Sequence, residues 1–185
     1  MRTFVAIELD KKIKDSLSAL IRKLDTAGRN VRWVESQGMH LTLKFLGEIS
    51  QDKITEVESV LGNIAKDYPP FQLSFTGTGT FPPGARVPRI VWVGVGKNET
   101  LQMIQARVEN ELQKIHFPRE KRKFHPHLTF GRVKGPQNLE TVIRTLNQYK
   151  EVDFGGMTVN RISLFKSTLK PSGAEYTILS EHRLE

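Results

Sequence analysis

Two short segments of the sequence each carry an imidazole beside a hydroxyl. The first reads His-Leu-Thr-Leu-Lys-Phe-Leu-Gly and starts at His40; the second reads Pro-His-Leu-Thr-Phe-Gly-Arg and carries His127. Polar and apolar residues alternate in both, which is the pattern of a strand buried on one face. Because residues i and i+2 of a strand share a face, His40 and Thr42 point the same way, as do His127 and Thr129. One His-x-Thr is a weak signal, so the functional prediction depends on its repetition.

Two histidines facing one cleft are suited to acid–base catalysis. Imidazole has an unperturbed pKa of about 6.5, so near neutral pH one ring can be protonated while the other is neutral. One ring then donates to a leaving oxygen while the other takes a proton from water. With a phosphodiester, threonine hydroxyls and a cation can hold the non-bridging oxygens as charge builds there. Lys44 and Arg132 are the nearest cations in the sequence.

The segments that must position these residues alternate between strand and helix patterns. Besides the two motif strands, we expect strands at residues 3–9, 31–34, 71–75, 90–95, 157–165 and 175–183. Apolar residues at helical spacing predict helices at residues 10–25, after residue 50, and over residues 101–115 and 139–146. Asp10 and Ser50 are suited to cap the first two helices, and Gly28 is expected to end the first. Residues 80–89 are rich in proline and are predicted to be a loop.

The two halves of the chain match at a constant offset. His127 follows His40 by 87 residues, and the same offset places strand on strand and helix on helix, including Phe71 on Thr158. We therefore predict an α+β fold in which a β-α-β-α-β unit is duplicated. A pseudo-twofold arrangement of the two units would place the two His-x-Thr strands face to face around one cleft. Residues 1–185 would form a single domain with one His-x-Thr motif in each lobe.

Composition limits the class of protein further. Lys and Arg number 28 against 20 Asp and Glu, which gives a net charge of +8 and favours polyanionic partners such as nucleic acid. The absence of cysteine excludes a disulfide framework, a thiolate metal site and a cysteine nucleophile. The N-terminus reaches Glu8 before a signal-like apolar segment can form, and the apolar runs are too short to span a membrane. We expect a cytoplasmic, monomeric protein without membrane contact.

The paired motifs resemble those of the 2H (two-histidine) phosphoesterases. The opening Arg-Thr-Phe-Val-Ala-Ile-Glu, the Arg-Trp-Val-Glu that starts at Arg32 and the Ser-Thr-Leu that starts at Ser167 are similar to one branch, the RNA 2′,3′-cyclic phosphodiesterases, historically called 2′–5′ RNA ligases. The resemblance extends over nearly the whole chain. It implies a bilobed α/β fold with two antiparallel sheets lining a central cleft and helices outside. It also implies hydrolysis of a terminal 2′,3′-cyclic phosphate of RNA to a 2′-phosphate without metal or cofactor. Small cyclic nucleotides are an alternative substrate.

The resemblance also implies a role for each motif residue. His40 would be the general acid that expels the 3′ oxygen and His127 the general base that activates water. Thr42 and Thr129 would hold the phosphate, and Arg132 matches an arginine that often follows the second motif. Phe130 departs from the smaller aliphatic residue that is usual there, and we expect it to alter packing rather than chemistry.

Alternatives remain open at several positions. His125 could form a His-x-His metal site with His127, although Pro126 and the missing third ligand argue against it. The basic run at residues 119–123 could follow an RNA backbone or be a solvated loop. Phe81, in the proline-rich segment, is the more plausible residue to stack on a base, whereas Trp92 is expected in the core. At the level of function, the rivals are 2′–5′ RNA ligation at the same site and a non-catalytic RNA-binding module.

Overall fold

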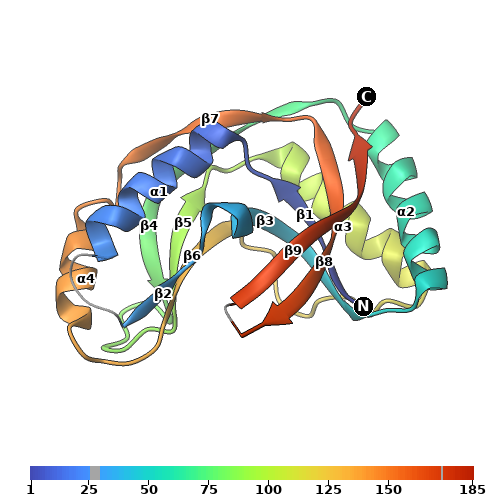
Figure 1. Ribbon diagram of the computed structural model, residues 1–185. Helices are drawn as coiled ribbons and strands as arrows, with labels where there is room; N and C mark the ends of the chain where they lie inside the picture. Colours follow the sequence, from blue (N-terminus) through green and yellow to red (C-terminus); the bar gives the residue numbers. More distant parts are fainter. Residues whose placement is uncertain (26–29, 172) are drawn as a thin grey trace.

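The computed structural model describes residues 1–25, 30–171 and 173–185. Figure 1 shows strands and helices following one another along these residues. In chain order the elements are β1 (Arg2–Glu8), α1 (Lys11–Asp25), β2 (Val31–Trp33), the short 3-10 helix η1 (Ser36–Gly38), β3 (His40–Glu48), α2 (Gln51–Lys66), β4 (Phe71–Phe81), β5 (Ile90–Val95), α3 (Glu99–Lys114), β6 (His127–Val133), α4 (Leu139–Asn147), β7 (Asp153–Val159), β8 (Arg161–Lys170) and β9 (Gly173–Arg183).

The strands form two antiparallel sheets. Sheet A has the order β3-β1-β8-β9 and sheet B the order β2-β6-β5-β4-β7. Helices α2 and α3 contact strands of sheet A, and α1 and α4 contact strands of sheet B. The molecule is an arch with the helices on its convex side (Figure 1). We call the face of each sheet turned away from its helices the inner face. The predicted α+β class with two antiparallel sheets is confirmed.

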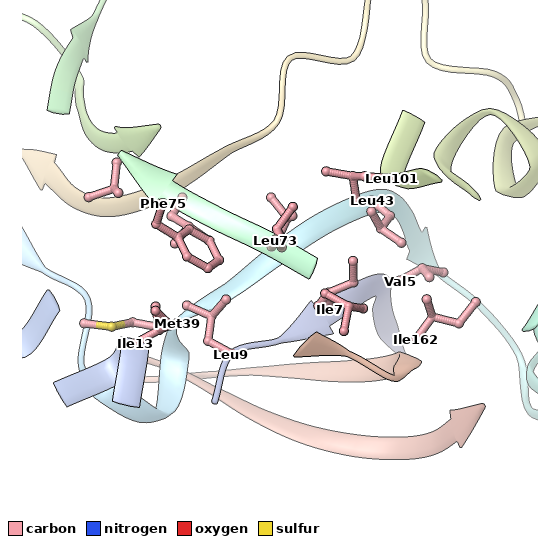
Figure 2. Packing of buried hydrophobic residues seen from close by; sticks show 14 of the residues in the cluster. Val5, Ile7, Leu9, Ile13, Met39, Leu43, Leu73, Phe75, Leu101 and Ile162 are labelled. Atoms are coloured by element: carbon pink, nitrogen blue, oxygen red, sulfur yellow. The ribbon is translucent and has the colours of Figure 1, made fainter. Parts of the chain in front are cut away.

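The apolar residues between the motif positions point toward the helices. Leu41 and Leu43 of β3, and Leu128 and Phe130 of β6, are all at most 4% exposed and belong to one core cluster. This cluster joins both sheets with all four helices, and Figure 2 shows part of its packing. Burial of these leucine and phenylalanine side chains, each worth about 1.5–3 kcal/mol, fixes which face of each motif strand is left for polar residues.

Most of the predicted elements are present, with two differences in the strands. The caps are as predicted: Asp10 accepts from the backbone N–H of Ile13 at 2.9 Å, and Ser50 from that of Lys53 at 3.4 Å. The predicted loop at residues 80–89 is wrong at its start, because β4 continues through Phe81 by pairing with β5. The single strand predicted at residues 157–165 is two strands, β7 and β8. Gly28, the predicted end of α1, lies outside the described residues.

The internal repeat is less regular than a plain copy of one unit. The sheets contain four and five strands, with β2 added at the edge of sheet B. Phe71 and Thr158, which the constant offset matches, both lie in strands, but these strands are neighbours in sheet B, where Gln72 opposes Thr158. The two copies of the repeat therefore correspond best at the two motif strands and the strands paired with them.

Candidate active site

The first motif lies on the inner face of sheet A. Leu41 and Leu43 occupy the core side of β3, so the alternation of the strand places His40 and Thr42 on the opposite side. Both are half-buried, and Thr42 is opposite Ala6 of β1. The small side chain of Ala6 leaves the hydroxyl of Thr42 without a bulky neighbour across the strands.

The ring of His40 is held among aromatic side chains. Its centroid lies 4.6 Å from that of Phe4, 5.6 Å from that of Phe165 and 4.9 Å from that of Tyr176, the last in an edge-on arrangement. Phe4 and Phe165 stack on each other at 5.2 Å and form, with Ala6, a small buried cluster separate from the main core. This cluster fixes the orientation of the imidazole and limits its access to water.

Burial changes the acidity of His40. It lowers the pKa of the imidazole to about 4, because the charged form loses hydration. A hydrogen bond to the backbone of Gly38 acts in the opposite direction and the charge of Lys14 in the same one. In the free protein at neutral pH, His40 is therefore uncharged.

The shifted pKa of His40 predicts a loss of stability in mild acid. Below about pH 6.5 the unfolded chain binds a proton at this histidine, whereas the folded chain binds it only near pH 4. Protonation therefore favours the unfolded state between these values, and the stability of the protein falls as the pH falls through this window. We expect His40 to account for about 2–3 kcal/mol of destabilisation between pH 7 and pH 4.5. Urea unfolding of the wild type and of His40→Asn at both pH values measures it. Burial lowers the pKa of His182 as well, but that effect is common to both proteins; equal pH dependence in the two would contradict the prediction.

The second motif lies on the inner face of sheet B, with an exposed histidine. Leu128 and Phe130 are buried, so His127 and Thr129 point to the other side. Nδ1 of His127 lies 2.7 Å from the carbonyl oxygen of His125, and because a carbonyl only accepts, Nδ1 carries the proton of this hydrogen bond. Nε2 is left as the nitrogen available to a ligand. Each motif histidine thus binds the backbone two residues earlier, His40 that of Gly38 and His127 that of His125.

The two motif strands adjoin although they belong to different sheets. Residues of β3 and β6 contact one another, and inner-face residues of sheet B reach sheet A. Arg32 of β2 lies close to the hairpin of β8 and β9. If Gly173 carried a Cβ atom, that atom would lie 2.6 Å from Nη2 of Arg32. Arg32 also opposes Arg132 across β2 and β6. Two guanidinium groups therefore lie on the sheet that carries His127.

Both motif strands contain a bulge directly after the threonine. In β3, Leu43 is an extra residue between the pairs Thr42–Ala6 and Lys44–Val5. In β6, Phe130 is the extra residue between the pairs Thr129–Trp92 and Gly131–Val91. A bulge reverses the alternation of side chains beyond it, so the residues that return to the inner face are Phe45 and Arg132.

This bulge corrects the expectation for Lys44. Instead of lying beside His40 and Thr42, Lys44 is turned to the core side, where its side chain is 3% exposed and its Nζ lies 2.7 Å from Oε2 of Glu109. It also donates to the carbonyl oxygen of Pro118 at 2.8 Å. The prediction that Lys44 binds the phosphate is therefore wrong. Arg132, which is exposed, is the basic residue of the two motif strands that faces the inner side.

Two aromatic residues of sheet B share the inner face with the second motif. Phe81 is 46% exposed and opposes Ile90, with the guanidinium of Arg89 5.8 Å above its ring. Trp92 opposes Thr129 on one side and Gly79 on the other; a Cβ on Gly79 would be 2.1 Å from the indole. Trp92 is thus half-buried over Gly79 rather than placed in the core as predicted from the sequence. Sequence reasoning missed Phe45, whose side chain is 69% exposed.

The described part of the chain holds neither a metal-binding cluster nor a membrane helix. No group of three or more His, Cys, Asp or Glu side chains there is arranged to hold a metal ion. The carbonyl oxygen of His125 is engaged with His127 in the hydrogen bond described above. No helix there has the length and apolar character needed to span a membrane.

Comparison with known proteins gives the family. Residues 13–170 match the 2′-5′ RNA ligase superfamily, and the chain belongs to this family. A protein of Methanothermobacter thermautotrophicus described as RNA 2′,3′-cyclic phosphodiesterase is 37% identical over 100% of this chain and 99% of its own. A Thermotoga maritima protein of the same description is 36% identical over 100% of this chain and 96% of its own.

Solved structures share the fold over the whole chain. The protein TT0787 of Thermus thermophilus superimposes with a TM-score of 0.84 at 26% identity, over 100% of this chain and 98% of its own. Escherichia coli LigT complexed with 3′-AMP superimposes with a TM-score of 0.76 at 25% identity, over 99% of this chain and 97% of its own. The resemblance predicted from the two motifs is confirmed at the level of the family.

Proposed function

We propose that this protein hydrolyses 2′,3′-cyclic phosphate ends of RNA to 2′-phosphate ends. The observation that carries the proposal is the pair of His-x-Thr motifs on adjoining strands, each histidine hydrogen-bonded to the backbone two residues earlier. Relatives described as RNA 2′,3′-cyclic phosphodiesterases, at 37% and 36% identity over the full chain, support the reaction and the substrate class.

In the proposed mechanism the two imidazoles divide the proton transfers. Nε2 of His127 takes a proton from water as the water oxygen attacks phosphorus. The bond from phosphorus to the 3′ oxygen breaks, and His40 gives a proton to that oxygen, which leaves a 2′-phosphate and a 3′-hydroxyl. The hydroxyls of Thr42 and Thr129 and the guanidinium of Arg132 stabilise the charge on the non-bridging oxygens.

The low pKa of His40 makes its proposed role dependent on the substrate. A general acid must be protonated, whereas burial keeps His40 neutral in the free protein at pH 7. An anionic phosphate placed within about 4–6 Å favours the charged imidazole and raises its pKa. Substrate binding would thus supply the protonated acid, and the aromatic contacts of His40 would keep that proton directed at the ligand.

The remaining features suit RNA. The net charge of +8 favours binding of a polyanion. Phe81 and the basic segment at residues 119–123 are candidate contacts with the RNA. The ends of tRNA fragments, or small cyclic nucleotides, are substrates that the same reaction would accept. We propose that the protein acts in the cytoplasm as a monomer. The reverse transfer, with an RNA hydroxyl in place of water, would give 2′–5′ ligation, and the description of the family favours testing it.

The test is a turnover assay on a short RNA that ends in a 2′,3′-cyclic phosphate, with EDTA present. We expect complete conversion to the 2′-phosphate, identified by mass and by its sensitivity to phosphatase. A parallel reaction with two RNA halves reports joining. An unchanged cyclic end would reject the hydrolase, and joining without hydrolysis would make the ligase the function.

A further inference from the structure

A buried polar network joins the strand of the first motif to the segment that leads to the second. Lys44 follows Thr42 by two residues on β3, and its Nζ lies 2.7 Å from Oε2 of Glu109 on α3. The ammonium group also donates to the carbonyl oxygen of Pro118 at 2.8 Å. The same carboxylate oxygen accepts from the backbone N–H of Glu120 at 3.1 Å. One ion pair therefore fixes the backbone beyond α3 against the first motif strand.

This backbone leads directly to the imidazole of His127. Residues 121–126 run from the network to β6 outside the helices and strands, with the half-buried Phe124 packed against the core. Within them, the carbonyl oxygen of His125 accepts the hydrogen bond from Nδ1 of His127 at 2.7 Å. Because that bond orients the ring, the direction of Nε2 depends on where the segment starts, which the network sets at Glu120.

Neither stability nor the local fold explains why the pair is charged. Burying two charges is costly, and an apolar pair of similar volume often replaces a buried ion pair without loss. The residue that directly follows the bulge is Lys44 in β3, and the equivalent residue of β6, 87 positions further along, is Gly131. The same bulge thus forms over an ammonium group in one lobe and over a glycine in the other, so the charge serves something other than the bulge.

Resting on the proposed function, we propose that Lys44 and Glu109 are positioning residues for the reaction, which hold the segment before the second motif so that Nε2 of His127 and the first motif face one phosphate. Their side chains are 3% and 6% exposed on the core side, so they act without touching the substrate. A displacement of about 1 Å at a reacting group can cost about 10²-fold in rate. Gln105 extends the network, with its Nε2 3.4 Å from the carbonyl oxygen of Leu43, the extra residue of the bulge, and 3.5 Å from Oε1 of Glu109.

The experiment separates position from stability with one pair of substitutions. The Lys44→Met, Glu109→Leu double variant puts apolar groups in place of the ion pair, which should keep most of the unfolding free energy, but it has lost both bonds to the backbone of the segment. We expect its kcat with a cyclic-phosphate RNA to fall by about 10- to 100-fold, with KM nearly unchanged. Arg107→Met breaks an exposed ion pair with Glu111 on the same helix. It is the matched control and should behave as the wild type.

A second readout requires no chemistry. In alkaline buffer, nitrogen NMR of the imidazole of His127 reports which ring nitrogen carries the proton, and the wild type should hold it on Nδ1. We expect the double variant to lose this preference, whereas Arg107→Met keeps it. If the double variant does not fold, Lys44→Met carries the same two measurements, with kcat normalised to the folded fraction seen by circular dichroism.

The outcomes separate this inference from the proposed function. A stable double variant with the wild-type rate and with His127 still protonated at Nδ1 would show that the pair acts on stability alone, and the inference would be overturned. A lower kcat with the tautomer unchanged would also contradict it, because the network would then act elsewhere than on His127. A stable variant that loses the tautomer supports the positioning role even when the wild type shows no turnover, a result that would reject the hydrolase only.

Discussion

Replacing His127 with asparagine is expected to lower the rate of cyclic phosphate hydrolysis by about 10²–10⁴-fold. Asparagine keeps a polar side chain on β6 but has no group that titrates near neutral pH, so it cannot take the proton from water. His127 is exposed and its ring makes a hydrogen bond to the carbonyl of His125, so the folded structure should tolerate the change. The measurement is kcat at pH 7 with a cyclic-phosphate RNA in EDTA.

A second histidine of similar exposure provides the control for this experiment. His116 is exposed just beyond the end of α3 and has a positive φ of 72°, a conformation that asparagine tolerates well. His116→Asn should therefore fold and turn over substrate at the wild-type rate. If His127→Asn retains a rate within a factor of three of the wild type, His127 is not the general base and the two-histidine mechanism is rejected.

The alternation of the sequence was sufficient to find the motif residues. Period-two patterns place His40 with Thr42 and His127 with Thr129 opposite buried leucines, and the structure has them so. The same pattern fails one residue later, since nothing in Leu-Thr-Leu-Lys-Phe-Leu reveals that Leu43 is a bulge. The face of Lys44 and of Phe45 depends on how β1 pairs with β3, which is a tertiary property.

Trp92 and Glu109 show the other reason why sequence reasoning was incomplete. A tryptophan in an apolar strand is typical of a core, but here the absence of a side chain at Gly79 makes room for the indole on the inner face. Glu109 lies 65 residues from Lys44 and on a helix with many other charges. Local patterns cannot select which of those charges is paired in the interior.

We expect substitutions in the buried ion pair of Lys44 and Glu109 to be among the most destabilising in sheet A. The two side chains are 3% and 6% exposed, and Glu109 also accepts from the backbone N–H of Glu120 at 3.1 Å. Removing one partner leaves an uncompensated charge in the core, which costs about 3–5 kcal/mol. We therefore expect Lys44→Met or Glu109→Gln each to lower the unfolding free energy by this amount, measured by urea denaturation at pH 7.

Two comparisons decide whether the charge or the packing is responsible. The Lys44→Met, Glu109→Leu double variant removes both charges and should recover much of the stability, since an apolar pair of similar volume replaces a buried ion pair well. Lys11→Met breaks the ion pair with Asp15, whose side chains are 88% and 61% exposed, and should leave stability nearly unchanged. If the double variant loses as much unfolding free energy as the two single variants together, the packing of these side chains and not their charge stabilises the protein. Because Lys44 and Glu109 also hold the backbone at Pro118 and Glu120, the single variants should in addition expose the segment leading to His127 to faster amide exchange.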